Sequence, residues 1–282
     1  MIRHKKLASN YSYIEIKNNQ AEAKIALQGG HVFHYKAKNK APLLWLSKRA
    51  FFKETKAIRG GIPICFPWFG AHKTDPTLPQ HGFARTALWN LILEEEIDAD
   101  TTRIQLQLTS TKESLKLWEY KFDIRLDITV SSELQIKFIV TNTDTKPFEF
   151  TSALHSYFNI LDIKNIWVDG LDGSRYIDSL TNKKDIQKGK LQIEKEVDRV
   201  YFDISKTIEL HDKNQSIILS QKGSNSLVVW NPWIEKTKKM IDMSADGYRT
   251  MLCLETANIG EDSKILEANE SHFLELRIAI KS

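Results

Sequence analysis

Apolar and polar side chains alternate along much of this chain, which is the pattern of half-buried strands in antiparallel sheets. In the segment 120–130, every second residue from Phe122 to Val130 is apolar, and most residues between them are charged. A short polar link at Ser132 and Glu133 joins this segment to the next alternating one, which predicts a hairpin. The full set of strands predicted in this way is 14–16, 23–27, 104–108, 120–130, 133–142, 216–219, 227–230, 251–255 and 274–280.

Helical patterns are few and short. Asn231 and Pro232 precede WIEKTKKM and predict one helix, with Asn as N-cap, Pro at the first position and lysines near the C-terminal end. A second turn is predicted over 112–118. Neither segment has the length of the helices that connect parallel strands. We therefore expect an all-β fold, one large antiparallel β-sandwich formed by residues 1–282 as a single domain.

Composition and charge narrow the classes of partner. The 282 residues are 41% apolar and carry 40 Lys and Arg against 36 Asp and Glu, a net charge of +4. The basic residues are scattered, so we expect no nucleic-acid partner, and we interpret the lysines of 236–239 as a solvated helix end. The N-terminus has no apolar core of a secretory signal, and no apolar run approaches the ~18 residues of a membrane helix. These features predict a cytoplasmic protein without membrane association, and the lack of an obvious exposed apolar seam favours a monomer.

The cysteines and a pair of histidines indicate structural rather than metal-binding roles. Cys65 and Cys253 both lie in apolar surroundings and are too few for a disulfide framework, so we expect buried, reduced thiols. His31 and His34 are three residues apart, but no third ligand lies near them in the sequence. We therefore expect no metal site.

The segment 58–85, IRGGIPICFPWFGAHKTDPTLPQHGFAR, breaks the alternation and combines glycines, prolines, aromatics and two arginines. Guanidinium groups such as those of Arg59 and Arg85 suit a phosphate or a carboxylate, although each could equally pair with a surface carboxylate. Gln80 and His81 could bind sugar hydroxyls or simply form a turn. The segment contains no nucleotide-binding glycine motif.

Four aromatic residues in or just after this segment could stack on a sugar ring: Trp68, Phe69, Phe83 and Trp89. We expect most of them to belong to the core.

Two further segments carry candidate acid–base groups. His155 in ALHSYF and Glu255 in MLCLET each interrupt an apolar, strand-like stretch. A carboxylate in such a stretch either faces solvent or lies in a site where burial makes it a better base. If both faced one pocket, they would form an acid–base pair. Asp198 could accept hydrogen bonds from two sugar hydroxyls or pair with a neighbouring Arg or Lys.

Taken in order, the motifs RGGIP, FPWFG, HGFAR, ALHSYF, VDRVYFD, VVWNPW and CLE resemble those of the glucose-6-phosphate 1-epimerases in the aldose 1-epimerase superfamily. The resemblance runs from QGGHV at 28–32 to the final strand. Two departures are the TAN that follows the Glu and Ser156 after the His.

The resemblance implies a galactose mutarotase-type β-sandwich that interconverts the anomers of a hexose 6-phosphate without metal or organic cofactor. It implies that His155 is the general acid and Glu255 the general base. It also implies substrate contacts from a further set of residues, with the arginines serving the 6-phosphate: Arg59, Gln80, His81, Arg85 and Asp198.

Two alternatives remain open at this point. The protein could act on an unphosphorylated aldose, in which case the two arginines would have no anionic partner in the substrate. It could also be a sugar-phosphate-binding module of the same fold without catalysis, although the presence of both His155 and Glu255 favours an enzyme.

Overall fold

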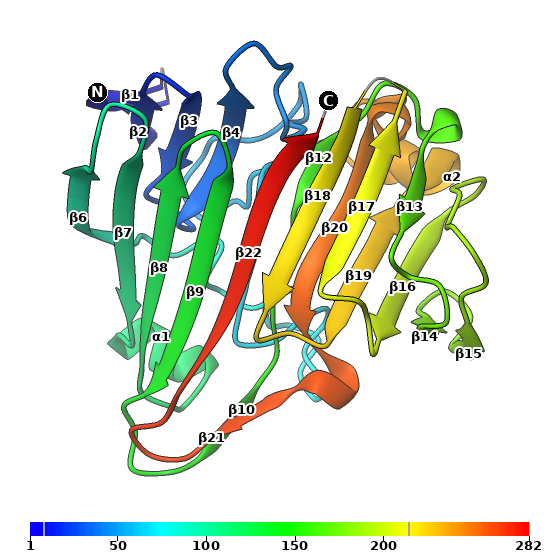
Figure 1. Ribbon diagram of the computed structural model, residues 1–282. Helices are drawn as coiled ribbons and strands as arrows, with labels where there is room; N and C mark the ends of the chain where they lie inside the picture. Colours follow the sequence, from blue (N-terminus) through cyan, green and yellow to red (C-terminus); the bar gives the residue numbers. More distant parts are fainter. Residues whose placement is uncertain (8, 214, 282) are drawn as a thin grey trace.

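The computed structural model describes residues 1–7, 9–213 and 215–281 and consists mainly of antiparallel sheets packed in two layers (Figure 1). The front layer is an eight-stranded sheet. Its strands, in spatial order, are β13 (Trp167–Asp169), β17 (Thr207–Asp212), β18 (Gln215–Lys222), β22 (Ser271–Lys281), β9 (Leu134–Asn142), β8 (Phe122–Val130), β7 (Thr102–Thr109) and β6 (Asn90–Glu96).

The layer behind it contains a second eight-stranded sheet and a four-stranded sheet. The second sheet has the order β15 (Lys183–Ile186), β14 (Arg175–Asp178), β16 (Val197–Phe202), β19 (Ser226–Asn231), β20 (Met251–Asn258), β11 (Ser152–Leu154) and β5 (Ile64–Cys65), with β12 (Tyr157–Asn159) also beside β20. The four-stranded sheet comprises β1 (Ile2–Lys6), β2 (Ser12–Lys17), β3 (Ala21–Ala26) and β4 (His31–Ala37), and a small ribbon pairs β10 (Phe148–Phe150) with β21 (Lys264–Leu266).

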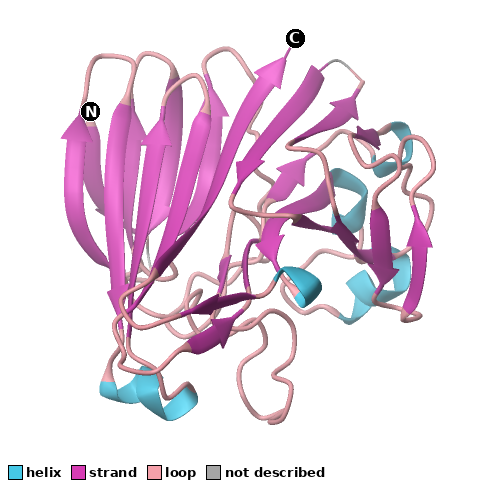
Figure 2. Cartoon of the chain, turned by 60° about the horizontal axis from the view of Figure 1, so that its bottom comes forward, coloured by secondary structure: helices cyan, strands magenta, loops and turns pink. Residues whose placement is uncertain are grey.

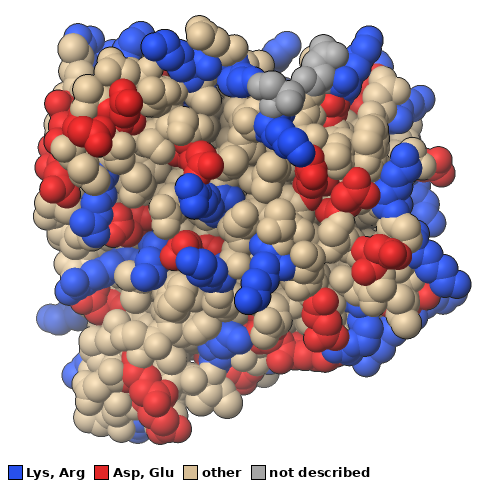
Figure 3. All heavy atoms as spheres, viewed as in Figure 1, with Lys and Arg blue, Asp and Glu red and all other residues tan. Residues whose placement is uncertain are grey.

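The alternation seen in the sequence produces the core between the layers. In β8 and β9 every second side chain is buried, and these side chains pack with those of the other layer in one apolar cluster. The polar side chains of the front sheet face outward, where Arg103 of β7 pairs with Asp127 of β8. On the face shown in Figure 3, basic and acidic side chains are intermingled rather than gathered by sign. Each segment predicted as a strand coincides with a strand over most of its length, and the predicted large antiparallel β-sandwich is confirmed.

Helices are short and lie at the margins of the sheets (Figure 2). Helix α1 (Lys112–Leu117) begins with a capping box between Thr111 and Ser114. Helix α2 (Trp233–Lys239) begins one residue later than predicted, and the side-chain oxygen of Asn231 accepts a hydrogen bond from the Trp233 amide at 2.9 Å. Single 3₁₀ turns occur at η1 (Ile163–Asn165), η2 (Gly247–Thr250) and η3 (Gly260–Asp262).

Strand β20 differs from the front strands because all eight of its residues are buried. Leu252 and Leu254 face the core between the layers. Cys253 lies on the opposite face, in a separate cluster with Trp230 and Tyr157. Since successive side chains of a strand point to opposite faces, Glu255 shares this second face with Cys253. The second face of β20 is where the candidate site lies.

Candidate active site

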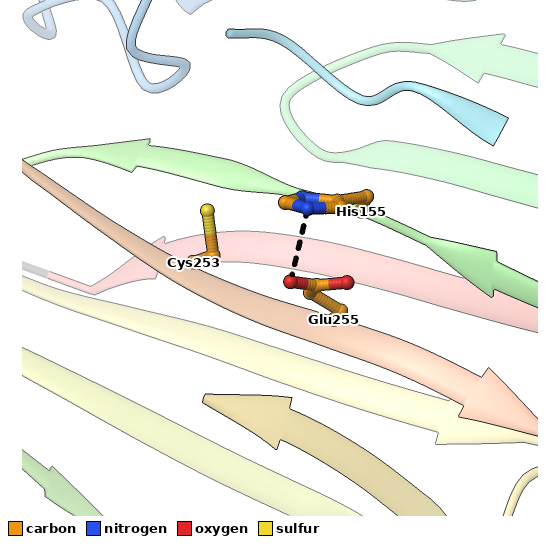
Figure 4. A group of neighbouring side chains, drawn as sticks. All are labelled: His155, Cys253 and Glu255. Atoms are coloured by element: carbon orange, nitrogen blue, oxygen red, sulfur yellow. Dashed lines mark ion pairs between the residues drawn. The ribbon is translucent and has the colours of Figure 1, made fainter. Parts of the chain in front are cut away.

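A break between two short strands brings His155 to Glu255. Strand β11 pairs with the last part of β20, with Leu154 opposite Thr256, whereas β12 pairs with the first part, with Tyr157 opposite Cys253. His155 therefore lies in the gap beside the middle of β20. Its Nε2 is 3.3 Å from Oε1 of Glu255. Figure 4 shows the two side chains facing each other. The two apolar segments singled out in the sequence do meet in space.

Burial controls the protonation of this pair. The His155 residue is 7% exposed and Glu255 is 1% exposed. Burial raises the pKa of Glu255, and the nearby charge of Asp198 raises it further. Burial also lowers the pKa of His155, an effect that Arg85 and Arg59 reinforce. Both pKa shifts favour the uncharged forms, a carboxylic acid and a neutral imidazole. The pair therefore holds one proton in total near neutral pH.

Each member of the pair also has an open polar atom. Among the described residues, neither Nδ1 of His155 nor Oε2 of Glu255 has a hydrogen-bond partner. Buried polar atoms are nearly always paired in folded proteins, and exceptions concentrate at functional sites. These two atoms are consequently available to a ligand.

Arg59 contacts Tyr157, the residue that stacks on the imidazole ring of His155. Tyr157 stacks on His155 with ring centroids 4.8 Å apart and an interplanar angle of 10°. The Tyr157 hydroxyl accepts a hydrogen bond from Nη1 of Arg59 at 2.9 Å. The same guanidinium donates from Nε to Asp242 at 3.1 Å, and its Nη2 is 3.1 Å from the same carboxylate oxygen. The sequence left open whether Arg59 pairs with a carboxylate, and the structure shows that it pairs with Asp242.

Arg85 is placed differently. Its Nη2 donates to the backbone oxygen of Gln80 at 2.5 Å. Among the described residues, no carboxylate lies within ion-pair distance of Arg85. Of the two arginines, Arg85 is the one whose charge is left for an anionic ligand.

The turn that carries Gln80 and His81 is held by close backbone contacts. Gly82 has a φ of +69°, and a Cβ at this position would lie 2.0 Å from the backbone oxygen of Phe66. The close approach of these two backbone segments therefore requires glycine. The His81 ring accepts a hydrogen bond from the Gly70 amide at 3.2 Å and packs edge-on against Phe69. Burial lowers the pKa of His81 to about 3, with Arg85 and Arg59 adding to the effect, so this ring is neutral.

The opposite side of the site comes from β16 and α2. Nζ of Lys236 is 3.9 Å from Oδ2 of Asp198 and 3.1 Å from Oε1 of Glu196. Burial raises the pKa of Asp198 while Lys236 opposes the shift. Arg199, the sequence neighbour of Asp198, lies instead 3.7 Å from Asp178. Asp198 therefore pairs loosely with a lysine and keeps acceptor capacity for a ligand.

A cavity of about 780 Å³ lies at this site. The residues expected at a site are all among those lining it: Arg59, Gln80, His81, Arg85, Asp198, His155 and Glu255. Trp68 and Phe69 also line the cavity. Trp68, Phe83 and Trp89 belong to the buried core cluster, as expected for most of the four aromatics. His31 is buried and bound to the Gly60 oxygen at 2.8 Å, and both cysteines are free and buried, as predicted.

Comparison with known proteins assigns the family. The sequence profile of the family described as "Aldose 1-epimerase" matches residues 12–279. The chain belongs to the aldose 1-epimerase family.

Relatives within the aldose 1-epimerase family cover most of the chain. A protein of Cenchrus ciliaris is 39% identical over 84% of this chain and 75% of its own length. One from Escherichia coli is 35% identical over 94% of this chain and 90% of its own length, and both carry the name "Putative glucose-6-phosphate 1-epimerase". The crystal structure of YeaD from Salmonella typhimurium superposes with a TM-score of 0.93 at 32% identity, covering 100% of this chain and 94% of that one.

Three contributors to this aldose 1-epimerase family site were not expected from the sequence. Lys236 was interpreted as part of a solvated helix end, but α2 packs so that it lines the cavity. Asp242 acts through Arg59 and carried no motif of its own, whereas Tyr157 stacks on His155 and lies in the ALHSYF motif but was not singled out. The N-cap of α2 is Pro232 rather than the expected Asn231, and the Asn231-Pro232 pair, which starts α2 directly after β19, was the available signal for Lys236. None of the helices in the described part of the chain has the length and apolar character needed to cross a bilayer.

Proposed function

We propose that this protein interconverts the α and β anomers of a hexose 6-phosphate, with glucose 6-phosphate as the substrate. The observation that carries the proposal is the 3.3 Å contact between His155 and Glu255 inside a cavity that also exposes the uncompensated charge of Arg85. The names carried by the relatives from Cenchrus ciliaris and Escherichia coli support the same substrate.

The proposed reaction begins with ring opening. Glu255, as carboxylate, takes the proton of the anomeric hydroxyl, and the electrons of that O–H bond form the C1 carbonyl. The bond between C1 and the ring oxygen breaks as His155, as imidazolium, gives its proton to that oxygen. After rotation about the C1–C2 bond, the hydroxyl attacks the other face of the carbonyl, and both proton transfers run in reverse.

The proton count of the pair suits this reaction. Ring opening as proposed needs the single proton on His155 beforehand and leaves it on Glu255, so the total stays at one. The pKa shifts of the empty site favour the proton on Glu255, so we propose that substrate binding moves it to His155 across the 3.3 Å contact. The burial that disfavours separate charges keeps that total near neutral pH. The anomeric and ring oxygens are bonded to the same carbon, which requires an acid and a base as close together as these two side chains.

The remaining lining residues have proposed roles in holding the substrate. Arg85 binds the 6-phosphate through its guanidinium fork. Asp198, Gln80 and His81 contact sugar hydroxyls as acceptors or donors. Arg59 also lines the cavity, but its bonds to Asp242 and Tyr157 make it chiefly a positioning residue for His155.

Saturation-transfer NMR of α- and β-glucose 6-phosphate tests this function. We expect the wild-type protein to accelerate anomer exchange, and His155→Ala and Glu255→Gln each to reduce the rate constant by about 10²–10⁴-fold. His72→Ala and Glu149→Gln are matched controls because both residues line the same cavity, and we expect them to retain the wild-type rate.

The outcomes separate the alternatives. Unchanged exchange in both pair variants would show that the acid–base assignment is wrong. A wild-type protein that binds glucose 6-phosphate without accelerating exchange would be a binding module. Faster exchange of glucose than of glucose 6-phosphate would identify an unphosphorylated aldose as the substrate.

A further inference from the structure

Cys253 adds a third ligand-forming group to the His155–Glu255 pair. It precedes Glu255 by two positions on β20, so both side chains point to the same face of the sheet. Sγ of Cys253, a carboxylate oxygen of Glu255 and a ring nitrogen of His155 all lie within 4.8 Å of one another. Figure 4 shows the three side chains together. All three residues are buried, and the anomer chemistry proposed above makes no use of the thiol.

We propose that these three residues form a binding site for a thiophilic divalent cation of the zinc class, and that its occupancy reversibly blocks the acid–base pair. Thiolate, imidazole and carboxylate together form a ligand set that zinc uses in proteins, with a fourth position left for water or substrate. Because His155 and Glu255 line the cavity, the fourth position of such a centre would open towards it.

The observed distances are close to those of such a centre. Zinc–nitrogen and zinc–oxygen bonds of about 2.0–2.2 Å at a tetrahedral angle place the two ligand atoms about 3.3–3.5 Å apart. Nε2 of His155 and Oε1 of Glu255 are already 3.3 Å apart. A zinc–sulfur bond of about 2.3 Å requires the sulfur within about 3.7 Å of the other ligands, so a side-chain rotation of Cys253 completes the site.

Charge balance also favours a divalent cation at this buried position. A thiolate, a carboxylate and a neutral imidazole offer two negative charges, which a divalent cation neutralises without leaving a net charge in the interior. Binding releases two protons to solvent, one from the thiol and one from the His155–Glu255 pair. Of the other charged groups facing the site, Asp198 favours the cation, Arg85 opposes it, and the charge of Arg59 is compensated by Asp242.

Inhibition of anomer exchange gives the first test. Protein treated with a chelator and then dialysed is titrated with zinc chloride in the exchange assay. We expect wild type to lose activity, with recovery on adding chelator and protection by glucose 6-phosphate. Cys253→Ala and Cys253→Ser are expected to be at least about tenfold less sensitive to zinc, since each lacks one ligand. Cys65→Ala is the matched control, because Cys65 is also buried and free but lies outside the three-residue cluster, and it should be inhibited like wild type.

Cobalt binding gives a test that does not depend on activity. Titration of wild type and Cys65→Ala with cobalt chloride should produce the near-ultraviolet absorption of a cobalt–thiolate bond, and sugar phosphate should reduce it. Both Cys253 variants should lack the band. Absence of the band in wild type, its persistence in both Cys253 variants, or activation by zinc would each overturn the proposal. A cobalt–thiolate band in a protein without epimerase activity would instead refute only the proposed function.

Discussion

Replacing Arg85 by Ala tests how the substrate is recognised. Nη2 of Arg85 is oriented by the Gln80 backbone oxygen at 2.5 Å, and no carboxylate of the described chain compensates its charge. This arrangement leaves the Arg85 guanidinium free to bind a phosphate. The substitution removes the guanidinium fork and leaves the His155–Glu255 contact in place.

The expected loss follows from the hydrogen bonds removed. A hydrogen bond to a charged group contributes about 1.5–3 kcal/mol, which corresponds to a factor of about 10–150 in kcat/KM. This loss should apply to glucose 6-phosphate, whereas kcat/KM for glucose should change less than about threefold because glucose has no phosphate for Arg85 to bind. Arg59→Ala should lower kcat/KM for both sugars, because Arg59 positions Tyr157 and through it His155.

The assay measures anomer exchange of both sugars by saturation transfer, over a range of substrate concentrations, for wild type, Arg85→Ala, Arg85→Lys and Arg59→Ala. Arg85→Lys keeps the charge without the planar fork and should recover part of the loss. The decisive quantity is the ratio of kcat/KM for the two sugars, which cancels any general damage to the active pair.

Equal losses for glucose and glucose 6-phosphate in Arg85→Ala would refute the phosphate assignment. A loss confined to glucose 6-phosphate in Arg59→Ala would show that Arg59, despite its bonds to Asp242 and Tyr157, is a direct phosphate ligand rather than a positioning residue.

Two further predictions concern stability. Burial lowers the pKa of His31 to about 4 in the folded protein, below its value of ~6.5 in the unfolded chain. As the pH falls, His31 is protonated first in the unfolded chain, which lowers the free energy of unfolding. The contribution of His31 to stability is therefore complete above pH ~6.5 and is lost towards pH ~4. Between pH 7 and 5 we expect the wild type to lose about 2 kcal/mol from this residue alone, and urea unfolding of His31→Gln should show a correspondingly smaller loss; equal losses would contradict the assignment. Gly82→Ala should cost more than about 2 kcal/mol, because its Cβ would meet the Phe66 oxygen, whereas Gly70→Ala, with a similar positive φ of +77° and nothing within 4 Å, should cost about 1 kcal/mol; equal costs in thermal unfolding would count against the contact.

The sequence was sufficient for those elements whose pattern is local. Residues 122–130 alternate with a period of two because one face is buried and the other is solvated, and both the strand and its orientation follow from that. Strand β20 is buried on both faces, so MLCLETAN indicates a buried strand but does not by itself show which face carries a site. The family resemblance, rather than any local pattern, supplied the pairing of His155 with Glu255.

Contacts between distant segments could not be derived in the same way. Asp242 and Arg59 are 183 positions apart, and their pairing depends on how the chain after α2 folds back towards Arg59. Lys236 belongs to a run of lysines whose sequence pattern fits a solvent-exposed helix end as well as a binding site. Only the placement of α2 in the fold brings it near Asp198. Such contacts depend on tertiary packing, for which a single sequence carries no local signal.

The position of β20 has a consequence for the dynamics of the site. This strand is hydrogen-bonded on both edges, by β19 on one side and by β11 and β12 on the other. Its amides should therefore exchange with deuterium only when the whole sheet opens, whereas the segment carrying Gln80 and Arg85 lies outside the strands and can open locally. Glu255, the proposed base, and Arg85, the proposed phosphate ligand, thus belong to different cooperative units, whereas Asp198 shares the sheet of β20. Selection could change the sugar phosphate that is recognised while the geometry of proton transfer stays fixed.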